Sequence, residues 1–398
     1  MKKLLALLLS FVLLLTLSAC GTDVGEDDGA LPDTEASAYR VAMIADCRDI
    51  TDRSFNQTIY EACKTFCVQE ELPFVYHKPA ENNVADQIAV VEQAISEGYN
   101  VLVLSGYTFA GMISAVQDRY PQVMFLALDV SEFDIEESFY QHDETGARTM
   151  LIDPENEPHI GENVYCAVYQ EELCGYMAGY AAVKLGYEHL GFLGGKAYPA
   201  VQRFGYGYVQ GADAAAAESG TEVTVEYLYG NQFEGTPAIT DRMDTWYQEL
   251  GVEVVFACGG GIYTSAAEAA SRVRGAKVIG VDVDQSKIID SAYGEGLTVT
   301  SAMKGLAATV NHILAEIVAG NFDAYGGRVE TLGLVSGEDP TLNYAQLPLE
   351  TTQWDKGFTE ADYRALVKAL FEGEIQVSAD VSMMPAHEIT VNVQEDIA

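Results

Sequence analysis

The sequence is poor in basic residues. It has 22 lysines and arginines against 60 aspartates and glutamates, which gives a formal net charge of −38. Binding to nucleic-acid phosphates or to an anionic lipid surface needs clustered lysine and arginine, so the composition argues against both. Hydrophobic residues still make up 48% of the chain. This fraction excludes intrinsic disorder, which requires low hydrophobicity as well as high net charge.

The sequence also lacks the motifs of common catalytic and metal sites. It contains no GxSxG or HExxH motif, and its six histidines are scattered. No two of its seven cysteines have the spacing of a zinc site. Cys63 and Cys67 stand at i, i+4 on an expected helix, a geometry that seldom suits a disulfide. We therefore expect no enzyme activity, no cofactor, no metal and free, buried cysteines, although an exported chain leaves room for one disulfide.

The one long hydrophobic run lies near the N-terminus and is too short to span a bilayer. It covers residues 4–17 after two lysines, whereas a spanning helix needs about 20 residues. This length fits the core of a secretory signal. The run ends in Leu17-Ser18-Ala19-Cys20, which resembles a bacterial lipobox; the alternative is an ordinary signal peptide with a chance cysteine. We expect residues 1–19 to be a lipoprotein signal peptide, Cys20 to carry the lipid, and the small, acidic residues 20–38 to form a tether.

The remaining chain alternates between apolar runs typical of buried parallel strands and segments with helical periodicity. Ile59, Cys63, Phe66 and Cys67, for example, share one face of a helix expected at residues 54–70. Strands are expected at residues 39–45, 73–77, 101–104, 123–128, 164–169, 190–193, 221–228, 254–257, 277–281 and 297–302. We predict no regular element between residues 320 and 358.

Two α/β series joined in mid-chain predict an α/β protein with two doubly wound, parallel-sheet lobes. Ligands bind at the carboxyl ends of such strands, so the loops of both lobes would face one hinged cleft. We expect the following division: lobe 1, residues 39–162 and about 283–325; lobe 2, residues 163–282 and part of about 326–378; an extra tail of unassigned role, residues 379–398.

Polar, aromatic and glycine residues follow several of these strands. The first strand leads to Asp46 and then to Asp52-Arg53-Ser54-Phe55-Asn56-Gln57, which opens a helix. Further segments follow in a fixed order: Val123–Leu128 with Asp129, Glu171-Glu172, Gly191–Gly195, Arg203-Phe204, Gly259-Gly260-Gly261, Gly280–Ser286 with Asp282, and Thr300–Lys304. In this order, over about residues 39–378, they resemble the basic membrane protein family of ABC-transporter substrate-binding lipoproteins.

The resemblance implies a type I periplasmic-binding-protein fold and a nucleoside ligand, because the best understood members resemble a purine nucleoside receptor. Phe55 and Phe204 would sandwich the base, one from each lobe, unless they are plain core aromatics. Asp46 and Asn56 would hydrogen-bond the edge of the base. The stretch Cys47-Arg48-Asp49 replaces a small, glycine-containing stretch of the family, and it bears on base specificity because this loop lines the cleft.

The resemblance also implies a ribose pocket. Asp282 would accept hydrogen bonds from the ribose hydroxyls, with Lys304 and the backbone near Gly260 beside it. The three glycines at 259–261 could equally form a plain turn. Asp129 follows another strand and is a further candidate for ligand binding. We interpret Asp52, Ser54 and Asp284 as helix caps and turn formers, and Glu171 and Glu172 as the start of a helix.

We therefore expect a receptor anchored through Cys20 on the extracytoplasmic face of the bacterial cell membrane. It would be a monomer that captures a nucleoside and delivers it to an ABC permease driven by a separate ATPase, with no nucleic-acid partner. One alternative is a receptor for another small polar ligand, such as a sugar or an autoinducer. The other is a lipid-anchored signalling partner or enzyme, which would need an activated nucleophile or a metal site.

Overall fold

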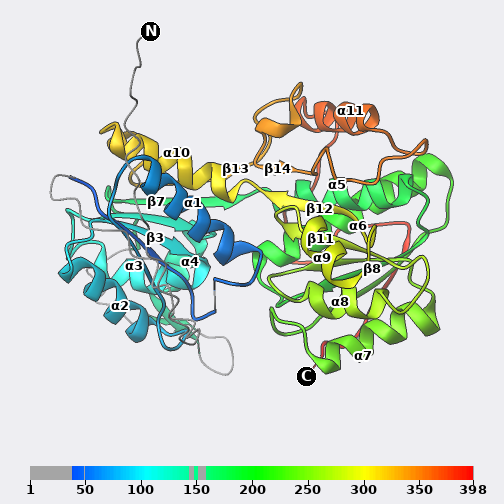
Figure 1. Cartoon of the computed structure of the whole chain (residues 1–398), viewed down its shortest axis with the longest axis horizontal. Helices are drawn as coiled ribbons and strands as arrows, with labels where there is room; N and C mark the ends of the chain where they lie inside the picture. Colours follow the sequence, from blue (N-terminus) through cyan, green and yellow to red (C-terminus); the bar gives the residue numbers. More distant parts are fainter. Residues whose placement is uncertain (1–37, 49, 143–147, 151–157, 398) are drawn as a thin grey trace, which may run out of the picture.

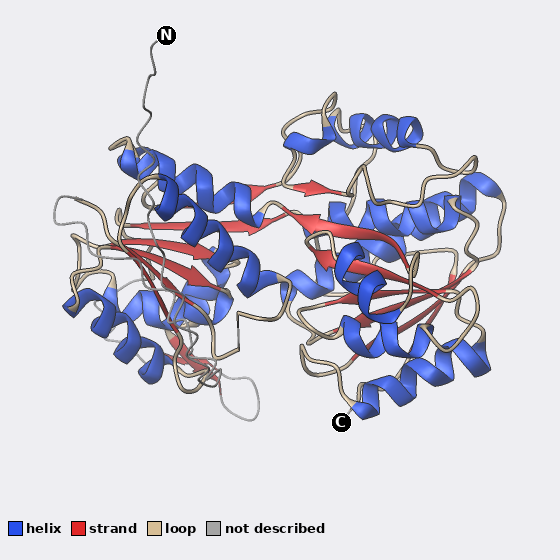
Figure 2. Cartoon of the chain, viewed as in Figure 1, coloured by secondary structure: helices blue, strands red, loops and turns tan. Residues whose placement is uncertain are grey.

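The computed structural model describes residues 38–48, 50–142, 148–150 and 158–397. Two sheets, each covered by helices on both faces, form two lobes (Figure 1, Figure 2). This confirms the predicted α/β class with two doubly wound lobes. The expected signal peptide, the lipidation site at Cys20 and nearly all of the tether lie outside the described residues. No helix in the described ranges is long and apolar enough to cross a membrane.

Lobe 1 is built on a six-stranded, fully parallel sheet with the strand order β13-β7-β4-β3-β1-β2. Helices α1 and α10 pack on one face of the sheet, and α2, α3 and α4 pack on the other. The strands are β1 Val41–Ile44, β2 Phe74–His77, β3 Val101–Ser105, β4 Met124–Leu128, β7 Val164–Tyr169 and β13 Arg328–Leu332; the helices are α1 Phe55–Gln69, α2 Val84–Ser96, α3 Ala110–Val116, α4 Glu132–Glu137 and α10 Leu306–Val318.

Lobe 2 has a seven-stranded sheet with the order β14-β12-β11-β10-β8-β9-β15, in which only β14 is antiparallel to its neighbour. Helices α5, α6 and α11 pack on one face, and α7, α8 and α9 on the other. The strands are β8 His189–Gly194, β9 Thr224–Tyr229, β10 Val254–Cys258, β11 Lys277–Asp282, β12 Thr298–Lys304, β14 Ala345–Gln346 and β15 Thr390–Val393; the helices are α5 Glu171–Lys184, α6 Pro199–Ser219, α7 Pro237–Thr245, α8 Tyr263–Ala270, α9 Ser286–Tyr293 and α11 Glu360–Phe371.

The division of the chain between the lobes differs from the sequence-based expectation. Strand β7, which we expected in lobe 2, pairs with β4 and belongs to the sheet of lobe 1. Strand β12, which we expected in lobe 1, pairs with β11 in lobe 2. Alternation along the chain gives the order of the elements, but it does not show which sheet edge accepts a strand. The chain therefore crosses between the lobes near Gln170, near Gly305 and between residues 333 and 344.

Helices α5 and α6 pack backbone against backbone through glycines. A Cβ atom on Gly175, Gly179, Gly207 or Gly211 would lie between 2.0 and 2.2 Å from a carbonyl oxygen of the facing helix. No side chain fits there, so glycine is required for this close approach. The packing fixes the N-terminal part of each helix relative to the other. The first turns of α6 line the cavity between the lobes, and the first residue of α5, Glu171, pairs with Arg203 of α6.

The C-terminal tail completes the sheet of lobe 2. Strand β15 pairs in parallel with β9, in a stretch where the sequence shows only alternating polarity. The side chain of Gln394 donates to Glu226 and accepts from Trp246 Nε1 at 3.1 Å. Ile397 N donates to Tyr229 O at 3.1 Å. The tail is thus an integral edge of lobe 2.

Candidate functional site

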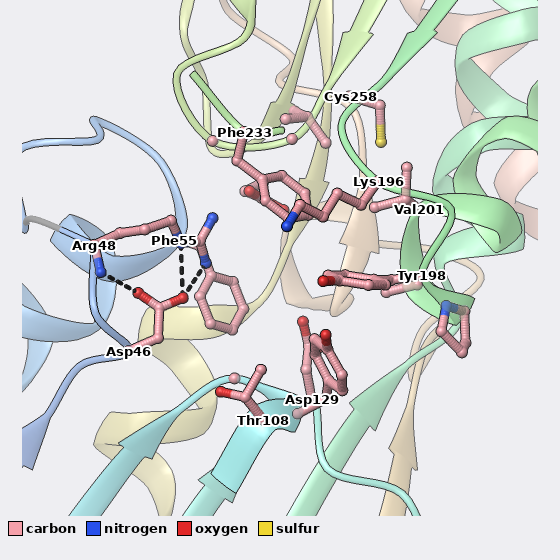
Figure 3. A pocket seen from close by; sticks show the side chains of 18 of the residues that line it. Asp46, Arg48, Phe55, Thr108, Asp129, Lys196, Tyr198, Val201, Phe233 and Cys258 are labelled. Atoms are coloured by element: carbon pink, nitrogen blue, oxygen red, sulfur yellow. Dashed lines mark hydrogen bonds and ion pairs between the residues drawn. The ribbon is translucent and has the colours of Figure 1, made fainter. Parts of the chain in front are cut away.

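A cavity of about 350 Å³ lies between the lobes, where the carboxyl ends of both sets of parallel strands meet. Seven of the eight ligand-binding residues predicted from the sequence line it, and Figure 3 shows several of them from close by. These seven are Asp46, Phe55, Asp129, Phe204, Gly260, Asp282 and Lys304. Asn56 is not among the lining residues.

Asn56 is buried behind the cavity wall, and its side chain is used within lobe 1. Its Nδ2 donates to Asp46 Oδ1 at 3.1 Å, and its Oδ1 accepts from Ser105 Oγ at 2.5 Å. The backbone amide of Asn56 donates to Asp52, which also accepts from the amides of Ser54 and Gln57. Asp52 therefore caps α1 as expected, while Asn56 supports Asp46 from behind and does not face the ligand space.

Asp46 follows β1 and is held by Arg48, which lies two residues further along the same loop. Arg48 Nε donates to Asp46 Oδ2 at 2.7 Å, and Arg48 Nη2 lies 2.5 Å from the same oxygen. The guanidinium carbon of Arg48 lies 4.7 Å from the ring centroid of Phe233, a residue of lobe 2. Burial lowers the pKa of Arg48, but its pairing with Asp46 outweighs this and raises the pKa overall. Arg48 is thus a charged part of the cavity wall.

A second group of charges is buried at the back of the cleft. Lys304 Nζ lies 2.7 Å from Asp129 Oδ2 and 3.0 Å from Glu171 Oε1, and Arg203 Nε donates to Glu171 Oε2 at 2.6 Å. Asp129 belongs to lobe 1, whereas the other three belong to lobe 2. This ion-pair cluster therefore bridges the lobes. Glu171 does begin α5, as expected, but its buried carboxylate mainly serves to neutralise two cations.

Burial and charge shift the pKa values in this ion-pair cluster in different directions. Burial raises the pKa of Asp129 to about 6, in spite of Lys304 beside it. Burial also opposes ionisation of Glu171, but Lys304 and Arg203 together hold its pKa below the ordinary value. For Lys304, burial lowers the pKa, and the facing carboxylates of Asp129 and Glu171 more than compensate and raise it. Lys304 and Glu171 are therefore charged, whereas Asp129 is poised near the physiological range.

Asp282 ends β11 and faces the cavity from lobe 2. Its Oδ2 accepts from Ser54 Oγ of lobe 1 at 2.6 Å, and its Oδ1 accepts no hydrogen bond from the described residues. Burial raises the pKa of Asp282 above its ordinary value. The hydroxyl of Ser54 thus donates to Asp282. Contrary to our expectation, the side chain of Ser54 does not cap α1. Asp284 behaves as predicted, because its carboxylate accepts from Ser286 N in a turn.

Aromatic rings from both lobes border the open space. Phe55 from lobe 1 and Phe204 from lobe 2 lie on Lys304, whose Nζ is 5.3 and 5.6 Å from their ring centroids. Phe204 is only 2% exposed and packs edge to face on Phe256, so it also belongs to the core. Tyr198 points into the cavity (Figure 3), and its ring centroid lies 4.6 Å from that of Tyr107 of the other lobe.

Sequence reasoning missed several lining residues, including Tyr107, Tyr198, Arg203 and Phe233. Arg203 stood beside the predicted Phe204, so its position was the available signal. Phe233 lies in a loop, Tyr198 directly precedes α6, and Tyr107 begins a short 3₁₀ helix, Tyr107–Phe109. None of the three had a motif in the sequence. Gly260 lines the cavity with a φ of 51°, a backbone conformation that favours glycine. The six cysteines of the described part are free, five of them buried and Cys47 half-buried.

Comparison with known proteins identifies the family. The model of the Bmp family, described as PnrA-like ABC transporter substrate-binding proteins, matches residues 39–338. The ABC transporter nucleoside-binding protein BmpA of Lactococcus lactis is 24% identical over 75% of this chain and 80% of its own length. Basic membrane protein B of Borreliella afzelii is 24% identical over 82% of this chain and 86% of its own length.

Solved structures agree on the fold. A solute-binding protein of an ABC transporter system from Conexibacter woesei superposes with a TM-score of 0.61 at 20% identity, over 86% of this chain and 99% of its own. One from Aeropyrum pernix superposes with a TM-score of 0.60 at 20% identity, over 85% and 87% of the two chains. These likenesses confirm the predicted type I periplasmic-binding-protein fold. The chain belongs to the Bmp family of PnrA-like ABC transporter substrate-binding proteins.

Proposed function

We propose that this substrate-binding protein captures nucleosides, specifically purine nucleosides, in the cleft between its lobes. Membership of the family makes it the binding component of an ABC transporter, which also comprises a permease and an ATPase. The nucleoside ligand is our proposal. It is supported by the relative from Lactococcus lactis, whose name describes a nucleoside-binding protein, and by the chemistry of the cavity.

One observation carries the proposal: the same cavity offers aromatic rings and a carboxylate with an open oxygen. Phe55 and Phe204 provide faces for a flat base, and stacking contributes about 1–3 kcal/mol per base. Asp282 Oδ1 is available to accept from hydroxyl groups of a ribose. A free base would leave the carboxylate without a partner.

Capture requires contacts from both lobes. The ligand space is bordered by Asp46, Phe55 and Asp129 from lobe 1 and by Phe204 and Asp282 from lobe 2. A ligand that contacts both walls stabilises the closed arrangement over the open one by its differential affinity. The three crossings between the lobes are where the hinge motion would take place.

Calorimetry with one purine nucleoside, its free base, its 2′-deoxy form and ribose tests the ligand class. We expect the ribonucleoside to bind most tightly and ribose alone not to bind measurably. The variant Phe204→Ala should weaken nucleoside binding by about 1–3 kcal/mol while its circular dichroism spectrum is unchanged. Equal affinity for base and nucleoside, or binding of ribose in preference to both, would contradict the proposal.

We also propose that Cys20 carries a lipid that holds the protein at the extracytoplasmic face of the cell membrane. The support is the lipobox-like Leu17-Ser18-Ala19-Cys20 after a short apolar run. Two acyl chains on one residue give stable anchoring, where one would be marginal. The variant Cys20→Ser should leave the detergent phase in a phase-partition experiment. Retention of this variant in the detergent phase, as firm as that of the wild type, would rule out the anchor.

A further inference from the structure

Asp46 has no acceptor site left for a ligand. Its Oδ1 accepts from Arg48 N at 2.9 Å and from Asn56 Nδ2 at 3.1 Å. Its Oδ2 faces Arg48 Nε at 2.7 Å and Arg48 Nη2 at 2.5 Å. A carboxylate has about four acceptor sites, so these four donors use them all. We expected Asp46 to accept hydrogen bonds from the edge of a base. Its acceptor sites are instead occupied by donors of its own lobe.

Arg48 presents donors where Asp46 would have presented acceptors. Its guanidinium carries five N–H groups, and the contacts with Asp46 use those of Nε and one of Nη2. Nη1 makes no hydrogen bond to the described residues, and Arg48 lines the cavity. The side chain is held at one end by Asp46 and on its face by the Phe233 ring (Figure 3). A guanidinium fixed in this way offers its remaining N–H groups in one defined direction.

We propose that Arg48 is a specificity-determining residue that selects nucleosides whose base presents a carbonyl oxygen to it, namely 6-oxopurine nucleosides such as inosine and guanosine, over adenosine. This inference rests on the proposed nucleoside function. A guanidinium donates and never accepts, so the 6-amino group of adenosine would place N–H against N–H. A site built to donate to a ligand oxygen rejects an analogue that lacks this oxygen. With adenosine, the guanidinium N–H and the 6-amino group would both be left unpaired in a closed cleft.

The test compares inosine, purine riboside and adenosine by calorimetry on the wild-type chain. Purine riboside has neither an oxygen nor an amino group at position 6. Its affinity therefore shows how much is lost when the acceptor is missing, apart from any repulsion by the amino group of adenosine. We expect inosine to bind at least about tenfold more tightly than adenosine, with purine riboside no tighter than inosine, because one charge-assisted hydrogen bond is at stake.

Two variants assign the preference to Arg48. Arg48→Met removes the donors and frees Asp46 Oδ2, which can then accept from an amino group, so the preference for inosine should vanish or invert. Arg53→Gln is the matched control, because Arg53 is an exposed arginine of the same loop that does not line the cavity. It should keep the wild-type ratio of affinities.

The outcomes separate this inference from the proposed function. If inosine and adenosine bind the wild type equally, or if Arg48→Met retains the wild-type ratio, the role of Arg48 is wrong while nucleoside binding stands. If no nucleoside binds the wild type, the proposed function is wrong, and the inference about Arg48 is wrong as well. If Arg48→Met does not fold, the order of the three ligands on the wild type still decides, because adenosine equal to or tighter than inosine overturns the proposal.

Discussion

Asp129 in lobe 1 and Asp282 in lobe 2 occupy equivalent places and have different partners. Each follows or ends an inner strand of its parallel sheet, and each has a left-handed backbone, with φ values of 61° and 66°. Each also contacts the opposite lobe through its Oδ2. Asp129 meets the ammonium of Lys304 at 2.7 Å, whereas Asp282 meets the hydroxyl of Ser54 at 2.6 Å.

The shared geometry indicates that the backbone aims both carboxylates into the cleft. A non-glycine residue in this conformation costs about 1–2 kcal/mol, so it persists only where the surrounding structure enforces it. The different partners separate the two roles. Asp129 is joined to a buried ion-pair cluster and acts as a latch between the lobes. The hydrogen bond of Asp282 is to a neutral hydroxyl, and its Oδ1 is open, so this oxygen is available to a ligand.

The largest effect, on the stability of the fold, should come from removing Lys304, the cation that pairs with Asp129. In Lys304→Met, Asp129 and one oxygen of Glu171 lose their partner in a site where Lys304 itself is 3% exposed. Leaving buried charges unpaired costs about 3–5 kcal/mol, which urea denaturation at pH 8 will measure. Lys368→Met removes an exposed lysine that also pairs with two carboxylates, and it should cost less than about 1 kcal/mol. Similar losses in the two variants would mean that the cluster does not stabilise the fold.

The next effect separates the two aspartates as ligand acceptors. Asp282→Asn should weaken nucleoside binding by about 10–100-fold, because a hydrogen bond to a charged group is worth about 1.5–3 kcal/mol. Binding of the free base should hardly change, since the base does not contact this carboxylate in our proposal. Asp129→Asn should change the nucleoside affinity less. Calorimetry on both variants measures these affinities. A larger loss of nucleoside affinity in Asp129→Asn than in Asp282→Asn would mean that Asp129, and not Asp282, is the ligand acceptor.

The pKa of Asp129, raised to about 6 by burial, predicts tighter binding at lower pH. Opening the cleft would return this carboxylate to water and bring its pKa toward the ordinary 3.8. Closure therefore takes up a proton between about pH 4 and 6, and acidification favours the closed state. The wild type should gain up to about tenfold in affinity from pH 7 to pH 5 relative to Asp129→Asn, which cannot titrate. A wild type that loses affinity relative to this variant would show the opposite coupling.

The smallest effect should come from Ser54→Ala, which removes the neutral partner of Asp282. One hydrogen bond between the lobes is lost, and its net value of about 0.5–1.5 kcal/mol corresponds to about two- to tenfold weaker ligand binding. Ser54→Thr keeps the hydroxyl and should bind like the wild type. If Ser54→Ala destabilises the protein as much as Lys304→Met does, the distinction between the latch and the ligand acceptor does not hold.

The sequence predicted the fold well where local pattern determines it. The face formed by Ile59, Cys63, Phe66 and Cys67 identified α1, and these four residues are buried as expected. Carboxylates at strand ends were correctly predicted to line the cleft, because parallel sheets bring these ends together. Strands β13 and β14, which lie where we predicted no regular element, and helices α4 and α9 were missed. Strand β13 is largely polar and lies at a sheet edge, and α9 spans only eight residues.

The sequence could not reveal which charges meet. Lys304 and Asp129 are separated by 175 residues, so their contact depends on how the chain crosses between the lobes. Arg48 and Asp46 are two residues apart, and here the signal was present in the unusual loop that follows β1. This loop was visible as a departure from the family pattern, but only the geometry shows that Arg48 fills acceptor sites of Asp46.

The path of the chain between the lobes has a further consequence for measurement. In the described part the chain crosses three times, an odd number, so residues 38 and 397 must lie on opposite lobes (Figure 1). A donor and an acceptor fluorophore placed near these two positions would therefore report the angle between the lobes through resonance energy transfer. Because neither position is among the residues that line the cavity, the chain could serve as the frame of a genetically encoded sensor for its own ligand.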